Sequence, residues 1–183
     1  MRLILSRRPS ADLITPLLAL PLFSDRPPTR GHTAWCDWRL DGAISGLVLE
    51  GRLTGQLGQK TLMGGAARVG ADRLLLFGCG PASAMDPERL QEAVAWMAAD
   101  AAKIKLDGWS LGVMGRELET LAYRDVAAST VRGLLQDARG QEAVRLVEED
   151  PEHFDLLVRE VRTGLHAMTA SGHACKLILE DDG

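Results

Sequence analysis

This sequence of 183 residues has few aromatic side chains, few cysteines and no apolar run long enough to cross a membrane. Three cysteines, Cys36, Cys79 and Cys175, are an odd number without a Cys-x-x-Cys pair, which disfavours a disulfide framework and a zinc knuckle. The apolar start of the chain ends at residues 6–9, Ser-Arg-Arg-Pro, too early for a signal peptide. These absences predict a protein of the reducing cytoplasm, without a membrane span, a metal or a cofactor.

The chain also lacks a large excess of charge of one sign, since 21 basic and 25 acidic side chains give a net charge of −4. The basic residues are spread along the chain, which disfavours a nucleic-acid partner. The short charged runs, residues 7–8 and 148–150, are interpreted as solvated surface. The length suits one domain that buries a sizeable core without help from a metal or disulfide.

Strand and helix patterns alternate along the chain. Continuous apolar runs predict strands that are covered on both faces, and apolar residues at helical spacing predict the helices between them. The clearest helix start has Asp86 as N-cap and Pro87 at the first helical position. The predicted strands are residues 2–5, 13–23, 61–63, 74–77, 109–114, 143–147 and 176–179, and the predicted helices are 37–51, 87–101, 126–135 and 151–168.

This alternation predicts an α/β protein, a three-layer α/β/α sandwich with a mostly parallel mixed sheet. Pro16 and Pro21 limit how much of the segment 13–23 lies centrally in that sheet. Residues 1–168 are interpreted as one domain. Residues 169–183 are interpreted as a C-terminal extension that adds an edge strand and an acidic tail.

Several stretches together resemble the N-terminal domain of the leucine (cytosol) aminopeptidase family. They are residues 20–23 (LPLF), 40–45 (LDGAIS), 50–55 (EGRLTG), 58–61 (GQKT) and 73–80 (RLLLFGCG), in the order and spacing found in that family. Weaker similarity continues to about residue 168. The resemblance implies a fold similar to that of macro domains, which bind ADP-ribose.

The catalytic motifs of the family are missing from this sequence. In full-length members, a second domain holds two divalent metals with motifs similar to Val-Gly-Lys-Gly, Phe-Asp-Ser-Gly-Gly and Asn-Thr-Asp-Ala-Glu-Gly-Arg. None of these occurs here, and the four lysines, Lys60, Lys103, Lys105 and Lys176, lie in other settings. A two-metal hydrolytic centre cannot be built from these residues, so the resemblance implies a non-enzymatic chain without catalytic residues or metal ligands.

The best candidate for ligand contact is the turn Gly78, Cys79, Gly80 and Pro81. A glycine turn at the carboxyl end of a buried strand lets backbone N–H groups approach an anion, and open α/β sheets bind ligands at this edge. A nucleotide or ADP-ribose is the small molecule that this alternative implies. The other interpretation is an ordinary turn, because the sequence lacks G-x-G-x-x-G spacing. Cys79 is interpreted as a packed cysteine rather than a reactive thiol.

Trp35 and Trp38 are three residues apart at the start of the first predicted helix, so they share one face and either anchor a partner protein or lie at the edge of the core. The partner is a second copy of the chain or a separately encoded aminopeptidase catalytic chain. Exposure of both rings favours the interface. The leading hypothesis is therefore a non-catalytic assembly, regulatory or protein-interaction module.

Other reactive side chains carry weaker hypotheses. The spacing of His166, His173 and Cys175 does not match the usual zinc ligand pairs. His32 and His153 are isolated and are interpreted as surface residues. No serine lies in a Gly-x-Ser-x-Gly elbow, so no catalytic triad is predicted.

Overall fold

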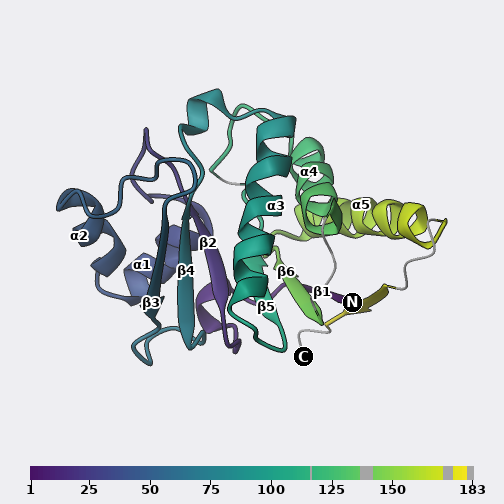
Figure 1. Cartoon of the computed structure of the whole chain (residues 1–183), viewed down its shortest axis with the longest axis horizontal. Coiled ribbons are helices and arrows are strands. Elements are labelled where there is room, and N and C mark those ends of the chain that lie inside the picture. Colours follow the sequence, from purple (N-terminus) through teal and green to yellow (C-terminus); the bar gives the residue numbers. More distant parts are fainter. Residues whose placement is uncertain (116, 137–141, 171–174, 181–183) are drawn as a thin grey trace.

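The computed structural model describes residues 1–115, 117–136, 142–170 and 175–180. A seven-stranded sheet lies between two layers of helices (Figure 1). The strands are β1 (Arg2–Ser6), β2 (Leu18–Leu22), β3 (Lys60–Gly64), β4 (Arg73–Gly78), β5 (Trp109–Gly112), β6 (Ala143–Val147) and β7 (Lys176–Leu179). The helices are α1 (Gly31–Arg39), α2 (Ala43–Leu49), α3 (Pro87–Lys103), α4 (Tyr123–Gln136) and α5 (Pro151–Ala170), with short 3-10 turns at Ser10–Asp12 and Ala82–Ala84.

The strand order is β3-β4-β2-β5-β6-β1-β7. Strand β3 runs antiparallel to β4, and all other neighbouring strands are parallel. This mixed, mostly parallel sheet confirms the predicted fold class. Strand β7 pairs with β1 at the edge of the same sheet, where a strand was expected. Treating residues 169–183 as an extension stays a prediction, and Asp181 and Asp182 of the predicted acidic tail lie outside the described residues.

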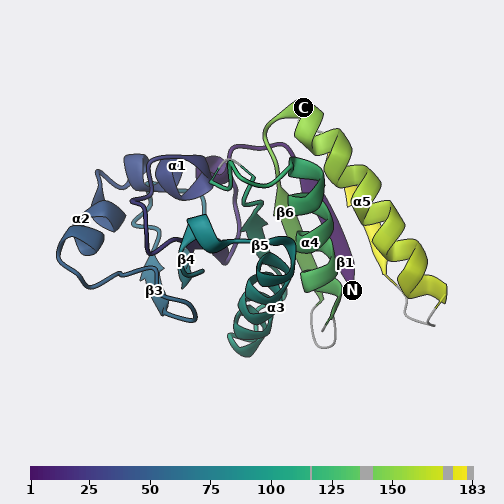
Figure 2. The same ribbon diagram turned by 90° about the horizontal axis from the view of Figure 1, so that it is seen from above.

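Each face of the sheet has its own apolar cluster. Helices α3, α4 and α5 pack on one face, where Phe77, Leu90 and Val126 belong to the larger cluster. Helices α1 and α2 pack on the opposite face, where Cys36 and Ile44 join a smaller cluster beneath β2 and β4. Figure 2 shows α1 and α3 on opposite sides of the sheet. The two clusters account for the continuous apolar runs in the strand sequences.

Helix α3 begins as predicted. The Asp86 side chain accepts a hydrogen bond from the backbone N–H of Arg89 at 2.8 Å, and Pro87 occupies the first helical turn. Leu90, Val94 and Met97 form its buried face. The cap, the proline and the apolar spacing thus agree on one helix.

The predicted helix over residues 37–51 is wrong in both its start and its continuity. Helix α1 already begins at Gly31, and the chain then breaks before α2, where Asp41 and Gly42 have φ of 54° and 77°. Asp37 reaches across this break, accepting hydrogen bonds from the N–H groups of Ile44 at 2.7 Å and Ser45 at 3.1 Å. A buried carboxylate from one helix therefore caps the start of the next.

The predicted strand over residues 13–23 is shortened to β2. Thr15 forms only an isolated bridge with Ala71, and pairing between β2 and β5 covers only Leu18 and Ala19. Pro21 lies beyond this short ladder, and its carbonyl accepts a hydrogen bond from the Thr33 hydroxyl at 2.7 Å. Strands β2 and β5 thus separate toward their carboxyl ends, which agrees with the expected limit set by the proline.

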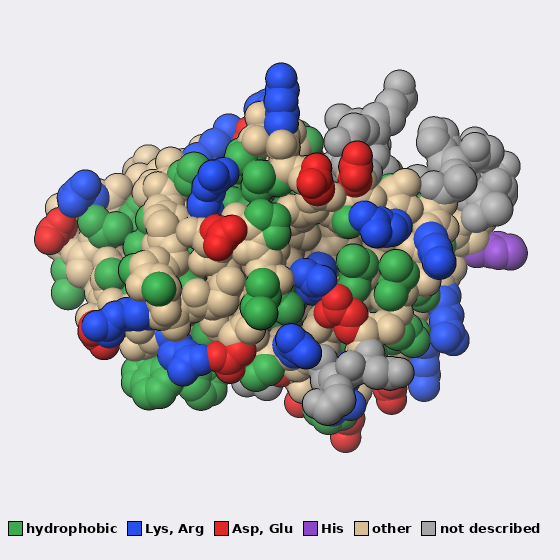
Figure 3. Space-filling model, turned by 90° about the horizontal axis from the view of Figure 1, so that it is seen from below, with side chains coloured by type: hydrophobic (Ala, Val, Ile, Leu, Met, Phe, Trp, Pro, Cys, Tyr) green, Lys and Arg blue, Asp and Glu red, His purple; other side chains and the backbone are tan. Residues whose placement is uncertain are grey.

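One face of the surface carries charged side chains of both signs. Basic and acidic side chains are interspersed on the face shown in Figure 3, with no continuous basic stripe. Among the described residues, no helix is both long and apolar enough to span a bilayer.

Candidate functional site

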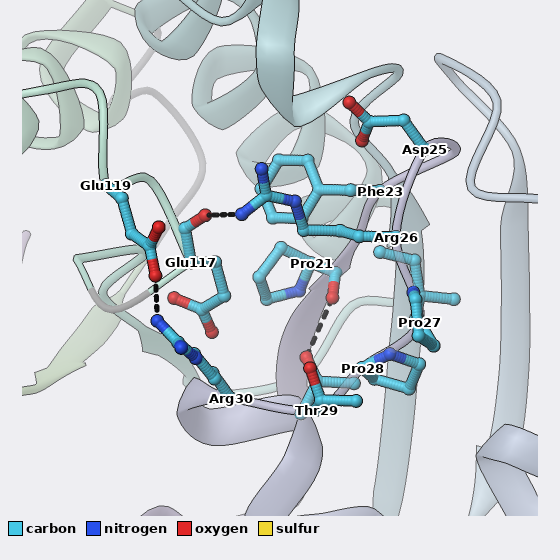
Figure 4. Close-up of a pocket in the computed structure, with 12 residues that line it drawn as sticks. Pro21, Phe23, Asp25, Arg26, Pro27, Pro28, Thr29, Arg30, Glu117 and Glu119 are labelled. Atoms are coloured by element: carbon cyan, nitrogen blue, oxygen red, sulfur yellow. Dashed lines mark hydrogen bonds and ion pairs between the residues drawn. The ribbon is translucent and has the colours of Figure 1, made fainter.

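A cleft of about 390 Å³ opens at the carboxyl edge of the sheet, where β2 and β5 separate. Helix α1, which follows β2, lies on one face of the sheet, and α4, which follows β5, lies on the other. Ligands of open α/β sheets bind at such a point, where successive connections leave in opposite directions. Figure 4 shows the cleft, which is lined by Pro21, Leu22, Phe23, Asp25, Arg26, Pro27, Pro28, Thr29, Arg30, Thr33, Glu117 and Glu119.

The carboxylate of Glu117 is the most unusual group in the cleft. Only 6% of the residue is exposed, and neither carboxylate oxygen has a hydrogen-bond partner of good geometry among the described residues. In Figure 4 the carboxylate points into the space between Arg30 and Pro21. A Cβ on Gly31 would lie 1.7 Å from Glu117 Oε1, so only glycine at this position leaves room for the carboxylate.

Two arginines lie at the same cleft. Arg26 donates a hydrogen bond from its guanidinium group to the backbone carbonyl of Glu117 at 2.9 Å, and Arg30 forms an exposed ion pair with Glu119 (Figure 4). Asp25 is already engaged on another side, because it accepts hydrogen bonds from the N–H groups of Ala82 and Ser83. The cleft thus combines one buried carboxylate, which has no hydrogen bond of good geometry among the described residues, with two guanidinium groups nearer to solvent.

A buried acidic cluster continues from the cleft floor toward β6. Glu148 is only 2% exposed, and His32 is 6% exposed with Nδ1 3.6 Å from Glu149 Oε1. A Cβ on Gly112 would lie 2.5 Å from the His32 ring, so this glycine makes room for the imidazole. The surface interpretations of His32 and of Glu148 are therefore wrong, because His32, in the first turn of α1, packs on Gly112 at the end of β5 and lies close to the acidic residues that follow β6.

Burial and charge shift the titration of this cluster. Burial disfavours the charged imidazole of His32, but the carboxylates of Glu149, Glu117 and Glu148 outweigh it and raise the pKa. Burial raises the pKa of Glu117, and the His32 imidazolium with the N–H groups of residues 117 and 32 opposes this only in part. Both groups therefore hold a proton more tightly in the folded chain than in the unfolded chain.

Tyr123 covers the cluster on the side of α4. Its hydroxyl donates a hydrogen bond to Glu148 Oε2 at 2.6 Å, and its ring stacks on His153 with centroids 3.8 Å apart. A Cβ on Gly115 would lie 2.4 Å from the Tyr123 ring. Burial, followed by the Glu148 charge, raises the pKa of Tyr123, so the phenol stays protonated and continues to donate. His153 is thus half-buried against an aromatic ring rather than isolated at the surface.

The acidic cluster predicts a stability that falls as pH rises. Raised pKa values mean that the folded state binds more protons, so the stabilisation is complete below the unfolded values, 4.5 for Glu117 and 6.5 for His32, and is lost as pH passes the folded values. The pKa values of Asp25 and Asp100 are lowered from 3.8, so these two groups add stability that is lost as pH falls. This loss occurs only in acid, below the range of the measurement described next.

Urea unfolding at pH 5, 6, 7 and 8 measures this dependence. We expect the free energy of unfolding to decrease across this range for the wild-type chain. Glu117→Gln should give a flatter curve and a chain more stable than wild type at pH 8, because it removes a buried charge and one of the groups that raise the pKa of His32. Glu92→Gln, on the exposed side of α3, should follow the wild-type curve. A wild-type stability that rises over this range would contradict the assignment.

The turn Gly78–Pro81 lies beside the cleft and does not line it. Its backbone N–H groups already donate to carbonyls: Gly78 to Gln59 at 2.7 Å, Cys79 to Leu22 at 2.8 Å and Gly80 to Gly55 at 2.9 Å. Anion binding by these N–H groups would require the bonds to break. The Cys79 side chain is buried, and burial raises the pKa of its thiol to about 12, as expected for a packed cysteine.

Trp35 and Trp38 lie exposed on α1, with 48% and 68% of each residue accessible to solvent. Their rings meet edge to face with centroids 6.0 Å apart. Both line a shallow groove with Ala34 and Gly115, and this groove adjoins the cleft because Arg30 lines both. The structure therefore brings the predicted aromatic pair next to a ligand-sized cleft at the carboxyl edge of the sheet.

The remaining hypothesis from the sequence concerns metal ligands. In the part of the chain that the structure describes, no group of three or more His, Cys, Asp or Glu side chains could hold a metal ion. His173 lies outside the described residues, so its placement beside His166 and Cys175 has no structural account. Sequence reasoning also missed Glu117. Its position shortly after an apolar strand, at the edge where α/β sheets bind ligands, was the available signal.

The fold is that of a macrodomain-like α/β/α domain. The Oceanobacillus iheyensis macrodomain with MES bound matches with a TM-score of 0.68 and 12% identity, covering 90% of this chain and 93% of that chain. The Trypanosoma brucei macrodomain in complex with ADP matches with a TM-score of 0.65 and 13% identity, covering 86% of this chain and 68% of that chain. These identities are low, so the likeness concerns the fold alone.

The family is shown by a separate match of the sequence. Residues 19–145 match the model of the cytosol aminopeptidase family, N-terminal domain, and the chain belongs to this family. A variant of tomato leucine aminopeptidase matches with a TM-score of 0.51 and 18% identity, covering 92% of this chain and 33% of that chain. The chain therefore spans about a third of the length of the tomato enzyme. No curated protein matches the sequence significantly.

Proposed function

We propose that this chain is a non-catalytic assembly module of the cytosol aminopeptidase family, which docks through Trp35 and Trp38. The exposed pair is the observation that carries the proposal. Two tryptophans on one helix present a large apolar surface at little cost in conformational entropy, and tryptophan is enriched among residues that dominate binding energy. Family membership supports a role beside a peptidase, because the tomato enzyme devotes about a third of its chain to this fold.

A second copy of the chain is the partner to which the proposal commits. In a two-fold contact the same patch meets itself, so a self-complementary aromatic pair is used on both sides. The edge-to-face arrangement leaves ring faces and edges available for further aromatic contacts. A separately encoded aminopeptidase catalytic chain is the other partner that family membership suggests.

Sedimentation velocity over a range of concentrations tests the docking surface. We expect the wild-type chain to associate and Trp35→Ser with Trp38→Ser to weaken association about 30-fold or more, because removal of one such anchor costs about 2 kcal/mol. Trp96→Ser is the matched control, since Trp96 is 46% exposed but lies on α3 across the sheet. A wild-type chain that stays monomeric would contradict self-association, and an equal effect of Trp96→Ser would contradict the assigned surface.

A nucleotide or ADP-ribose ligand is the second candidate function. It is favoured by the fold, which the Trypanosoma brucei macrodomain in complex with ADP shares. The N–H groups at Gly78–Pro81 already donate to backbone carbonyls, and the buried Glu117 carboxylate would repel an anionic ligand. We therefore rank nucleotide binding below assembly. A ligand at 100 times its Kd should stabilise the fold by about 2.7 kcal/mol, so a thermal shift with ADP and ADP-ribose separates the two functions.

A further inference from the structure

We propose that the strand-end cleft binds a small zwitterion, an amino acid with an apolar side chain, with its ammonium group on Glu117 and its carboxylate facing Arg26 and Arg30. This site adjoins the docking surface proposed above, because Arg30 lines both, but the inference does not rest on that surface. Its chemistry differs from that of a nucleotide, because the deepest charged group of the cleft is an anion.

Glu117 supplies the reason to expect a cationic donor. A carboxylate that is removed from water without hydrogen bonds is costly, and ligands that donate to it recover that cost. Its side chain is more than nine-tenths buried, has two acceptor oxygens without a hydrogen bond of good geometry among the described residues, and lines the cleft between Arg30 and Pro21 (Figure 4). An ammonium group has three N–H donors and the opposite charge, which makes it a good partner for this carboxylate.

The position of the carboxylate is built into the local backbone. Gly31 has φ of 71°, and its missing Cβ leaves the space that Glu117 Oε1 occupies. Glu117 also lies at the first turn of α1, where the helix dipole favours a negative charge. Both features hold the charged group at one place even without a ligand.

The arginines bind the carboxylate at the opposite end of the ligand. Arg26 uses one N–H on the carbonyl of Glu117 and keeps further guanidinium donors, and Arg30 is held by Glu119 at the same rim. Guanidinium groups recognise carboxylates with two parallel hydrogen bonds. A simple amine would offer no acceptor to the remaining guanidinium donors, and a phosphate would be repelled by the charge of Glu117. A zwitterion forms more favourable contacts in the cleft than either.

The walls and the volume define the side chain. Phe23, Pro21, Pro27 and Pro28 line the cleft and present apolar surface. A volume of about 390 Å³ accommodates an amino acid but is at the small end for larger ligands. We therefore use L-phenylalanine as the probe, because its ring packs against proline and phenylalanine walls.

Calorimetric titration with three compounds tests the proposal on the wild-type chain. L-Phenylalanine carries both charges, 2-phenylethylamine lacks the carboxylate and 3-phenylpropanoate lacks the ammonium group. We expect L-phenylalanine to bind best, 2-phenylethylamine to bind at least about tenfold more weakly and 3-phenylpropanoate to show no measurable binding. No heat with L-phenylalanine at millimolar concentrations would overturn the proposal, as would 3-phenylpropanoate that binds as well as L-phenylalanine.

Glu117→Gln tests the named group. Glutamine keeps the size but removes the charge, so binding of L-phenylalanine and of 2-phenylethylamine should fall about tenfold or more. Glu92→Gln is the control for loss of one acidic charge on the exposed side of α3, and it should leave both affinities unchanged. A folded Glu117→Gln chain with wild-type affinity would show that the carboxylate only caps α1. The three-compound comparison needs no variant and decides the ligand class even if Glu117→Gln fails to fold.

Discussion

Replacing Gly78 by alanine should lower the free energy of unfolding by about 3 kcal/mol. Gly78 is the last residue of β4, and a Cβ there would lie 2.0 Å from the backbone oxygen of Gln56. The neighbouring loop cannot move away freely, because the Gly78 N–H donates to Gln59 at 2.7 Å and its carbonyl accepts from Gly58 at 2.9 Å. The new methyl group therefore strains backbone against backbone at the buried end of β4.

Thermal unfolding measures this effect, and an expected shift of about 2 to 4 °C per kcal/mol places the midpoint roughly 6 to 12 °C lower. Gly46→Ala is the matched control. Gly46 lies inside α2 with no atom within 4 Å of the added methyl group, so the same substitution should stabilise the chain by about 0.5 to 1 kcal/mol. Equal effects at both positions would contradict the tight approach of residues 55–59 to the end of β4.

Replacing Asp37 by alanine should cost about 2 to 3 kcal/mol, because three hydrogen bonds from the start of α2 are lost. Asp37 is 6% exposed, and its Oδ1 accepts from the N–H groups of Ile44 and Ser45 while Oδ2 accepts from the Ser45 hydroxyl. Without the carboxylate, the buried N–H of Ile44 keeps no comparable acceptor. Helix α2 should then loosen together with the loop that precedes it.

Asp37→Asn is the control for this change, since an amide oxygen still accepts from Ile44 but the second acceptor is lost. We expect it to cost about half as much as alanine, measured by urea unfolding. Hydrogen exchange gives a local readout, because the amides of α2 should lose protection in Asp37→Ala while those of α3 keep it. Unchanged protection in α2 would contradict the role assigned to Asp37.

Much of the fold follows from the sequence pattern alone. The bounds predicted for residues 143–147 and 176–179 are those of β6 and β7, because both segments are short apolar runs between clear breaks. Asp86 and Pro87 identified the start of α3 for the same local reason. Local chemistry decides these elements, so no knowledge of tertiary contacts was needed.

The split between α1 and α2 could not be predicted from periodicity. Leu40 and Ile44 pack in one cluster, so their spacing suits a continuous helix even though the chain turns between them. The turn depends on left-handed backbone at Asp41 and Gly42 and on a cap supplied by Asp37, seven residues before Ile44. Only tertiary structure reveals that this capping side chain is buried.

The candidate site was harder to predict than the fold. The exposed pair Trp35 and Trp38 could be found from helical spacing. The buried charges His32, Glu117 and Glu148 come from three separate segments that the sheet brings together, and each resembles a surface residue when its own segment is considered. Nothing in the sequence pattern singles out Gly31 and Gly112, although each makes room for one of these charged side chains. The glycine turn at Gly78–Pro81 stood out in the sequence, but its N–H groups bind backbone carbonyls.

The central proposal is that this chain binds rather than hydrolyses, and a peptidase assay of the purified chain tests it most directly. The chain is incubated with manganese or zinc and a leucyl substrate, and product is followed against a protein-free reaction. We predict no turnover above that background, because the described residues offer no cluster of ligands for hydrolytic metals. Turnover that rises with the concentration of the chain and stops on addition of a chelator would contradict the claim.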